Sequence, residues 1–249
     1  MNPTKKICML IQRFHPYLGG TELQALRLSK ALLRTKEYDV FIITQRTKPS
    51  LKKFEIVDGL PVHRLFGYGE KLIGSIFFCI SSLIFLISNR KKFDIIHTYL
   101  ASSNAIVTGI IGKILHKKTI LKFGGARATG DIATSKKKFF GLLKLEFIKR
   151  TIDYFVCPSE EVKIEIIEFG FKEEKVFVIP NGVETEIFAP IDITLKLKLR
   201  QQLNLPKNST ILLYSGRLSH GKGLKTLIEI FSELLKQKSN LHLLLVGGG

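Results

Sequence analysis

Tryptophan is absent from the 249-residue chain, methionine occurs twice and cysteine only three times. The cysteines Cys8, Cys79 and Cys157 stand inside apolar runs and lack the spacing of metal ligands. So few cysteines argue against a disulfide-stapled secreted domain, and their spacing argues against a zinc site. We therefore expect free, packed thiols in a protein of a reducing compartment.

Acidic residues are also scarce, because 21 Asp and Glu stand against 39 Lys and Arg, for a net charge of +18. A surface of this charge attracts polyanions such as nucleic acid, anionic lipid headgroups or phosphorylated substrates. No recognisable nucleic-acid-binding module accompanies the charge, so we expect no nucleic acid partner. An anionic substrate, an anionic membrane surface and a basic surface without a specific partner remain as alternatives.

Long hydrophobic runs are missing, with one exception. Ile7–Ile11 has five apolar residues, which is too short for the core of a signal peptide and predicts a buried strand. Leu72–Ser88 has 17 residues without a charge, at the lower limit for a membrane-spanning helix. A span would place its flanking strands on opposite sides of a bilayer, so we expect a helix buried against a sheet. A helix whose exposed face enters a membrane interface is the alternative.

Short apolar strands that alternate with helical patterns predict an α/β fold with a parallel sheet. The predicted strands are Ile7–Ile11, Asp39–Thr44, Leu60–Phe66, Phe93–Thr98, Thr119–Phe123, Tyr154–Pro158, Val176–Ile179, Ile211–Tyr214 and Leu241–Val246. Helices are predicted after a Thr21 cap, at Leu72–Ser88, at Ser135–Thr151, after a Ser159 cap, at Leu195–Leu203 and from Leu224 to Lys236. Residues 1–183 would form a first domain, 184–208 an interdomain linker and 209–249 part of a second domain.

The segment Ser135–Thr151 mixes six basic residues with apolar residues at helical spacing. It predicts one basic amphipathic helix. Such a helix either presents a solvated face or docks onto anionic lipid, at about 1 kcal/mol per basic residue near the surface.

The most informative stretch is Ile211–Phe231, in which a strand, a basic glycine-rich loop and a helix follow one another. The loop supplies three glycines and two cations, namely Gly216, Arg217, Gly221, Lys222 and Gly223. A helix N-terminus offers free N–H groups and partial positive charge, and glycines let an anion approach closely, so this order predicts a phosphate site. Its spacing approaches that of a P-loop, but Gly223 stands where that motif needs Ser or Thr for magnesium.

A second set of residues gathers near predicted strand ends in the first domain. The pair Gly19-Gly20 precedes a helix and predicts a turn that accommodates an anion or a sugar. Open α/β sheets bind ligands at the carboxyl ends of their strands, and four residues stand at or after such ends: His97, Lys122, Gly124 and Arg127. A simple tight turn and a packing histidine are the structural alternatives.

Gly216-Arg217-Leu218, Lys222-Gly223 and Leu227-Ile228 resemble the donor-site signature of retaining GT-B glycosyltransferases. The branch is the glycogen-synthase-like one (family 4, or group 1), which includes bacterial cell-surface sugar transferases. The resemblance extends, in the family's order, to Pro16–Glu22, Asp94–His97, Ile179–Val183, Phe188–Pro190 and Val246–Gly248. It therefore covers nearly the whole chain.

The resemblance implies two Rossmann-like domains, of which the first binds an acceptor and the second a nucleotide-sugar. It implies that Arg217 and Lys222 contact the diphosphate and act in catalysis. The donor-phosphate residues would be Gly19, Gly20, Gly216, Gly221 and Gly223, and the acceptor-cleft residues His97, Lys122, Gly124 and Arg127. Many members have a histidine where Gly124 stands, so the role of that histidine is not transferred.

The implied reaction is hexosyl transfer with retention of configuration, without a metal or other cofactor. The acceptor would be a glycan or a lipid-linked molecule in cell-surface polysaccharide synthesis. The implied location is cytoplasmic and peripheral, on the inner face of the plasma membrane, where an anionic surface is a further partner.

The second domain is expected to be truncated. Two parallel strands and one helix cannot cover their own faces, and the family's Glu-x7-Glu motif would lie beyond Gly249. Two other classes of function stay open. One is a P-loop-like ATPase that uses Gly216–Lys222, and the other is a basic, non-catalytic module that binds membranes or anionic partners.

Overall fold

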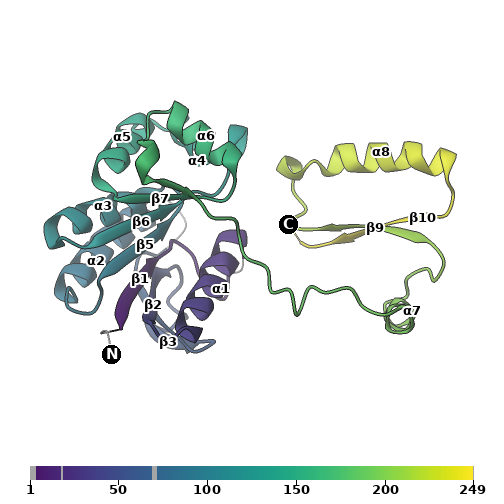
Figure 1. The fold of residues 1–249 in the computed structure, drawn as a ribbon, viewed down its shortest axis with the longest axis horizontal. Coiled ribbons are helices and arrows are strands. Elements are labelled where there is room, and N and C mark those ends of the chain that lie inside the picture. Colours follow the sequence, from purple (N-terminus) through teal and green to yellow (C-terminus); the bar gives the residue numbers. More distant parts are fainter. Residues whose placement is uncertain (1–3, 18, 69–71, 249) are drawn as a thin grey trace. The chain divides into compact units, whose positions relative to one another are not determined.

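The computed structural model describes residues 4–17, 19–68 and 72–248. The chain divides into two compact units, the first ending at Val183 and the second starting at Glu184 (Figure 1). Both units are built from strands and helices that alternate along the chain, as predicted for an α/β protein.

The first unit contains an eight-stranded sheet in the order β3-β4-β2-β1-β5-β6-β7-β8. The pairs are parallel except β3 with β4, which form an antiparallel hairpin. The strands are β1 Lys5–Leu10, β2 Tyr38–Arg46, β3 Phe54–Val57, β4 Leu60–Phe66, β5 Ile95–Tyr99, β6 Lys118–Lys122, β7 Tyr154–Cys157 and β8 Val176–Val178. The seven strands predicted here are found within a few residues of their expected bounds, and β3 was missed.

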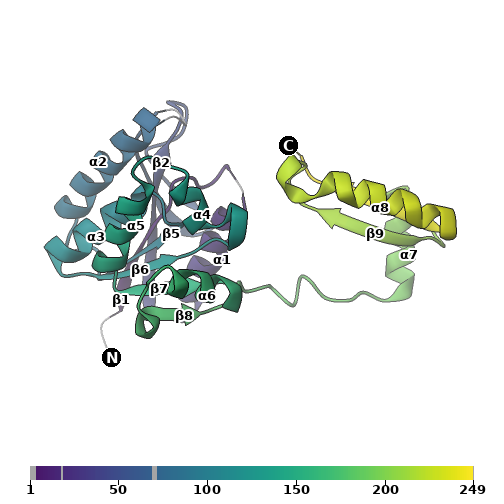
Figure 2. The same ribbon diagram turned by 90° about the horizontal axis from the view of Figure 1, so that it is seen from above.

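Helices cover both faces of this sheet (Figures 1 and 2). They are α1 Gly20–Arg34, α2 Leu72–Ser88, α3 Ser103–Leu115, α4 Asp131–Lys136, α5 Gly141–Thr151 and α6 Glu160–Glu168. Successive side chains of a strand point to opposite faces. Accordingly, Met9 of β1 packs in a cluster with Ala25 of α1, whereas Cys8 packs with Phe78 of α2 and Val107 of α3. All three cysteines are free, and Cys8 and Cys157 are buried.

Two predicted helix boundaries are wrong. Thr21 does not cap α1, because the helix already begins at Gly20 and its N-cap is Gly19, whose extended backbone leads into the first turn. The segment 135–151 is not one helix. The chain turns between α4 and α5, where the Gly141 N–H donates to the Lys138 carbonyl at 2.9 Å. A Cβ on Gly141 would lie 1.6 Å from the Ser135 carbonyl oxygen, so this turn depends on close backbone contact.

The run Leu72–Ser88 forms α2 with the predicted bounds. Phe78 and Leu86 are fully buried against the sheet, but Ile73, Ile76 and Ile84 are between 50% and 66% exposed. The helix is thus apolar on both its buried and its solvent-facing sides. Within the described part of the chain, no helix is both long and apolar enough to span a bilayer.

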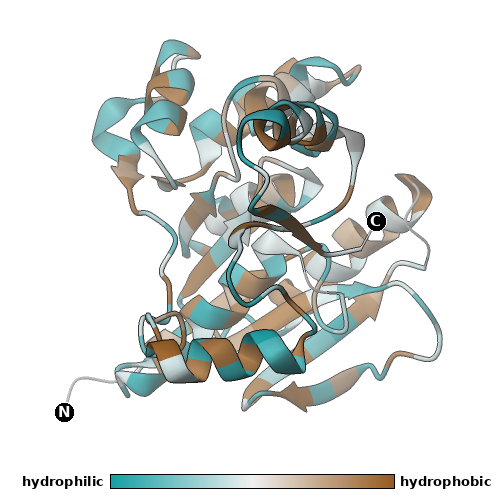
Figure 3. Ribbon diagram, turned by 90° about the vertical axis from the view of Figure 1, so that its right-hand side faces the viewer, coloured by the Kyte–Doolittle hydropathy of each residue, from teal (hydrophilic) through white to brown (hydrophobic). Residues whose placement is uncertain are grey.

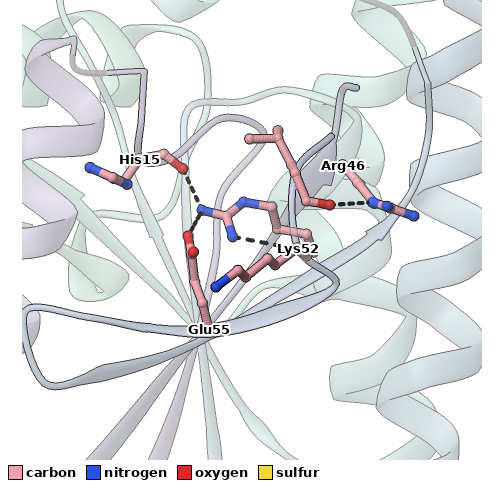
Figure 4. A network of polar contacts seen from close by, with 6 residues as sticks. His15, Arg46, Lys52 and Glu55 are labelled. Carbon is pink, nitrogen blue, oxygen red and sulfur yellow. Dashed lines mark hydrogen bonds and ion pairs between the residues drawn. The ribbon is translucent and has the colours of Figure 1, made fainter. Parts of the chain in front are cut away.

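A buried arginine fixes the loop that follows β1 (Figure 4). Arg64 of β4 is 3% exposed, pairs with Glu55 at 2.5 Å and donates to the His15 carbonyl at 2.5 Å. Arg46 of β2 donates from Nε to the Leu51 carbonyl at 2.7 Å. Because a buried charge is costly unless it is paired and hydrogen-bonded, the contacts of Arg64 define the backbone path shortly before the glycine pair.

The second unit contains α7 (Ile193–Gln202), β9 (Thr210–Ser215), α8 (Leu224–Gln237) and β10 (Leu241–Val246). The two strands are parallel, with Thr210 opposite Leu241. Asp192 caps α7, and the Arg200 guanidinium donates to three carbonyls just before β9, so this predicted linker carries an anchored helix. Figure 3 colours the strands and much of α8 as hydrophobic, yet no side chain whose exposure is described in this unit is buried.

Candidate functional site

The glycine loop of the second unit connects β9 to α8. At its start, the Gly216 N–H donates to the Val246 carbonyl at 2.9 Å and the Leu218 N–H to the Gly248 carbonyl at 3.0 Å. A Cβ on Gly247 would lie 1.8 Å from the Gly216 carbonyl oxygen, so only glycine allows the two strand ends to meet in this way. The loop is therefore held by the glycine turn that follows β10.

At its other end, the loop leads directly into α8. Gly223 is the N-cap of that helix and has the left-handed conformation, with φ of 69°, that favours glycine. Arg217, Gly221 and Lys222 are exposed. Among the described residues, neither Arg217 nor Lys222 has an ion-pair partner. Two cations and the first N–H groups of α8 are thus available to an anion.

In the first unit, a cavity of about 180 Å³ lies at the carboxyl ends of β5 and β6. Gly20, Lys122 and Gly124 all line it, so the fold brings together residues predicted from two separate stretches of the chain. Lys122 is 5% exposed, and burial lowers the pKa of its ammonium group. Gly19 precedes this lining and caps α1.

A larger cavity of about 520 Å³ lies beside the first. Thr21, Tyr99 and Leu100 line both cavities. Leu100 has a φ of 64°, an uncommon conformation for leucine, and its N–H donates to the Lys122 carbonyl at 2.8 Å. Non-glycine residues in this conformation cluster at functional sites, where surrounding contacts hold them.

Two lysines, Arg13 and one carboxylate line the larger cavity. Lys144 donates to Ser135 Oγ at 2.8 Å, and burial, followed by the charge of Lys138, lowers its pKa to about 8. Lys138 lies on the turn between α4 and α5, and Glu22 of α1 is the carboxylate. Sequence reasoning missed both lysines as site residues because the segment was expected to be one surface helix.

Asp131 is a third residue that sequence reasoning missed. Its carboxylate accepts the Ala101 N–H and the Gly124 N–H, each at 2.7 Å, and so ties the loop after β5 to the loop after β6. Burial raises the pKa of this carboxyl group, and the backbone hydrogen bonds partly offset that effect. The available signal was its place directly after the glycine-rich stretch that follows β6.

Two predicted cleft residues lie elsewhere. His97 was expected at the end of its strand, but β5 continues to Tyr99, and His97 is buried in mid-strand with its ring stacked on Tyr99 at 4.7 Å. Arg127 pairs with Glu161 of α6, and its N–H donates to Glu165 at 2.7 Å. Neither lines the two cavities. The described residues contain no group of three His, Cys, Asp or Glu side chains that could hold a metal ion.

The burial of His97 gives the protein a specific pH dependence. Burial, and secondly the charge of Lys122, lower its pKa from 6.5 to about 3. The folded state holds His97 as the neutral imidazole, whereas the unfolded chain protonates it below pH 6.5. The free energy of unfolding is therefore unaffected by this residue above pH 6.5 and falls as the pH decreases from 6.5 toward 3. At pH 5 the unfolded chain gains about 2 kcal/mol from protonating this residue.

We therefore expect the free energy of unfolding of the first unit to fall more between pH 7 and pH 5 in the wild type than in His97→Leu, by about 2 kcal/mol. Urea unfolding of both proteins at the two pH values measures this difference. Carboxylates contribute equally to both proteins and cancel. Equal losses in the two proteins would show that His97 is not buried as the neutral form.

Two family models match the chain. The model of Glycosyltransferase Family 4 matches residues 18–187, and that of Glycosyl transferases group 1 matches residues 196–249. The phosphatidylinositol N-acetylglucosaminyltransferase GPI3 subunit of Saccharomyces cerevisiae is 25% identical over 98% of this chain and 53% of its own length. Alpha-monoglucosyldiacylglycerol synthase of Streptococcus pneumoniae is 26% identical over 98% of this chain and 56% of its own. The chain thus spans about half the length of these relatives.

Solved structures show the same fold. Alr3699/HepE of Anabaena, in complex with UDP and glucose, aligns with a TM-score of 0.70 at 20% identity, over 98% of this chain and 61% of that one. UDP-N-acetylglucosamine 2-epimerase from Rickettsia bellii aligns with a TM-score of 0.61 at 15% identity, over 98% and 62%. Because the first family model spans most of the first unit and the second begins in α7, the chain belongs to Glycosyltransferase Family 4 and has the GT-B fold.

Proposed function

We propose that the protein transfers a hexose from a nucleotide-diphosphate-sugar to a glycan or lipid-linked acceptor of the cell surface. The observation that carries this proposal is the loop 216–223, which presents Arg217 and Lys222, without ion-pair partners in the described part of the chain, directly before the N-terminus of α8. Such a loop suits a diphosphate. It belongs to the unit that the group 1 family model matches.

In this reaction, the bond between the sugar and the diphosphate breaks, and negative charge develops on the leaving diphosphate. Arg217 and Lys222 would stabilise that charge from fixed positions, which is the most effective form of electrostatic catalysis. Arginine suits two-point contact with phosphate oxygens, and lysine acts as a point charge. We further propose retention of configuration and no required metal ion.

The acceptor would bind in the first unit, at the cavities lined by Tyr99 and Leu100. This place agrees with the rule that open α/β sheets bind ligands at the carboxyl ends of their strands. The relatives support an acceptor with a lipid part, since one is named for phosphatidylinositol and another for a diacylglycerol glycolipid. The complexes of Alr3699/HepE support a nucleotide-sugar as donor.

Two other functions have less support. The epimerases share the GT-B fold, so the fold alone does not select transfer, and the family models are what favour it. A P-loop ATPase would need a magnesium-binding Ser or Thr where Gly223 stands. A purely membrane-binding module does not account for the match of the chain to two glycosyltransferase family models.

Calorimetric titration of the 249-residue chain tests the proposal. The ligands are UDP, UMP, UDP-glucose, UDP-N-acetylglucosamine and GDP-mannose, each with and without magnesium. We expect a nucleoside diphosphate and its sugar to bind at least tenfold more tightly than the monophosphate, independently of magnesium. Binding of none of them at millimolar concentration, or hydrolysis of ATP that requires magnesium, would contradict the proposal.

A further inference from the structure

An apolar groove of about 280 Å³ runs between α2 and α3 in the first unit. Ile76 and Ile80 line one side, from α2, and Ile106 and Ile110 line the other, from α3. Almost all of the exposed lining is carbon. An apolar groove of this kind accommodates a hydrocarbon chain and offers nothing to a free sugar.

The groove borders the larger cavity of the proposed acceptor site. Leu72, Ser75, Ser103 and Ile106 line both hollows, so the groove and the cavity are direct neighbours. At the cavity end the lining becomes polar, with Gln12 and Gln45, whose side chains are hydrogen-bonded to each other at 2.6 Å. A ligand that occupies both parts must therefore be amphipathic.

The polar end carries positive charge. Lys138 and Lys144 line the cavity from the α4–α5 turn and from α5, and Arg13 lines it from the loop after β1, against the single carboxylate of Glu22. Burial, and secondly the charge of Lys138, lowers the pKa of the Lys144 ammonium group. Three cationic residues that line one cavity favour an anionic group at this end.

We propose that the acceptor is an anionic lipid, whose charged headgroup lies at Lys138 and Lys144 and whose hydrocarbon chain lies in the α2–α3 groove. This inference rests on the proposed function for its meaning as an acceptor, but the binding itself does not require the donor site. An anionic lipid matches both hollows. A soluble sugar has no hydrocarbon chain for the groove, and a neutral lipid has no charge for the lysines of the cavity.

The surface around the groove suits delivery of such a ligand from a membrane. Ile73, Phe77 and Ile84 of α2 are exposed on the side that faces away from the sheet. On the α4–α5 turn, Phe139 is 94% exposed and follows three consecutive lysines. Exposed apolar side chains beside lysines are the combination that enters an anionic bilayer interface.

The test uses three soluble probes, with affinities measured by calorimetry below the critical micelle concentration. Dodecyl phosphate has both the chain and the anion, inorganic phosphate has only the anion, and dodecyl maltoside has the chain with a neutral sugar headgroup. We expect dodecyl phosphate to bind at least tenfold more tightly than either of the others. Similar affinity for dodecyl phosphate and dodecyl maltoside, or for dodecyl phosphate and inorganic phosphate, would overturn the proposal.

Matched variants place the ligand. Ile76→Glu introduces a carboxylate into the groove, whereas Ile84→Glu makes the same change on an exposed part of α2 outside it. Lys138→Ala removes a cavity lysine, and Lys137→Ala removes its exposed neighbour. We expect Ile76→Glu and Lys138→Ala to weaken dodecyl phosphate binding at least tenfold, and the two controls to change it less than twofold.

If both members of a pair weaken binding equally, the probe adsorbs to the surface, and the groove proposal is wrong. The affinity for UDP is measured on the same variants and is expected to stay unchanged. Loss of lipid selectivity with intact UDP binding would refute this inference alone. Intact lipid selectivity without UDP binding would refute the proposed donor function instead.

Discussion

Replacing Arg217 by alanine is expected to lower the rate of sugar transfer by about a hundredfold or more, and Lys222→Ala is expected to do the same. Both side chains are exposed beside the N-terminus of α8, and no acidic partner among the described residues competes for them. Their removal leaves the developing charge of the leaving diphosphate without its cations. The measurement is the transfer rate with the donor that binds best in calorimetry, together with the affinity for UDP.

Lys236→Ala is the matched control, because it removes one positive charge from the last turn of the same helix, where Lys236 pairs with Glu233 at 2.7 Å. We expect near-normal transfer from this variant. All three lysine and arginine side chains are exposed, so circular dichroism spectra should be unchanged. Near-normal rates in both Arg217→Ala and Lys222→Ala would remove the donor-site assignment.

The second large effect concerns the turn between α4 and α5. Gly141→Ala is expected to lower the free energy of unfolding of the first unit by about 3 kcal/mol, because its Cβ would lie 1.6 Å from the Ser135 carbonyl oxygen. The neighbour is backbone and not the end of a flexible side chain, so the α4–α5 turn itself must move. Urea unfolding at pH 7 measures the loss.

Gly182→Ala serves as the comparison, since a Cβ there would have nothing within 4 Å. We expect a change below about 1 kcal/mol for this variant. The Gly141→Ala protein should also bind dodecyl phosphate more weakly, because Lys138 lies on the turn that is displaced. A Gly141→Ala protein as stable as Gly182→Ala would mean that the turn adopts another path.

The spacing of apolar residues along the chain predicted the helices and strands whose formation depends on local sequence pattern. The bounds of α2 and β4 were predicted to the residue, because each is a continuous apolar or alternating run with clear flanks. The strand β3 was missed because it pairs as an edge strand after a basic loop and its burial depends on β4. The α4–α5 break was missed because helical spacing continues through Gly141, and only a contact with Ser135 reveals the turn.

The candidate site divides in the same way. The loop 216–223 could be read from the sequence because its strand, glycines, cations and helix are consecutive. In the first unit, Gly20, Lys122 and Gly124 were identified one motif at a time, whereas Asp131 and Lys144 were not. The importance of Asp131 comes from a contact with Ala101 across 30 residues of chain, and that of Lys144 from a cavity lined by several elements.

The sequence by itself determined the alternation of strands and helices, the family and the chemistry of the phosphate loop, since each depends on residues that are neighbours in the chain. Only the tertiary structure decided that His97 is buried, that Arg127 is engaged by α6 and that α2 leaves an apolar groove beside α3. Those outcomes depend on which side chains from distant segments share a face of the sheet. Burial and pairing act through space, and residue order alone does not specify them.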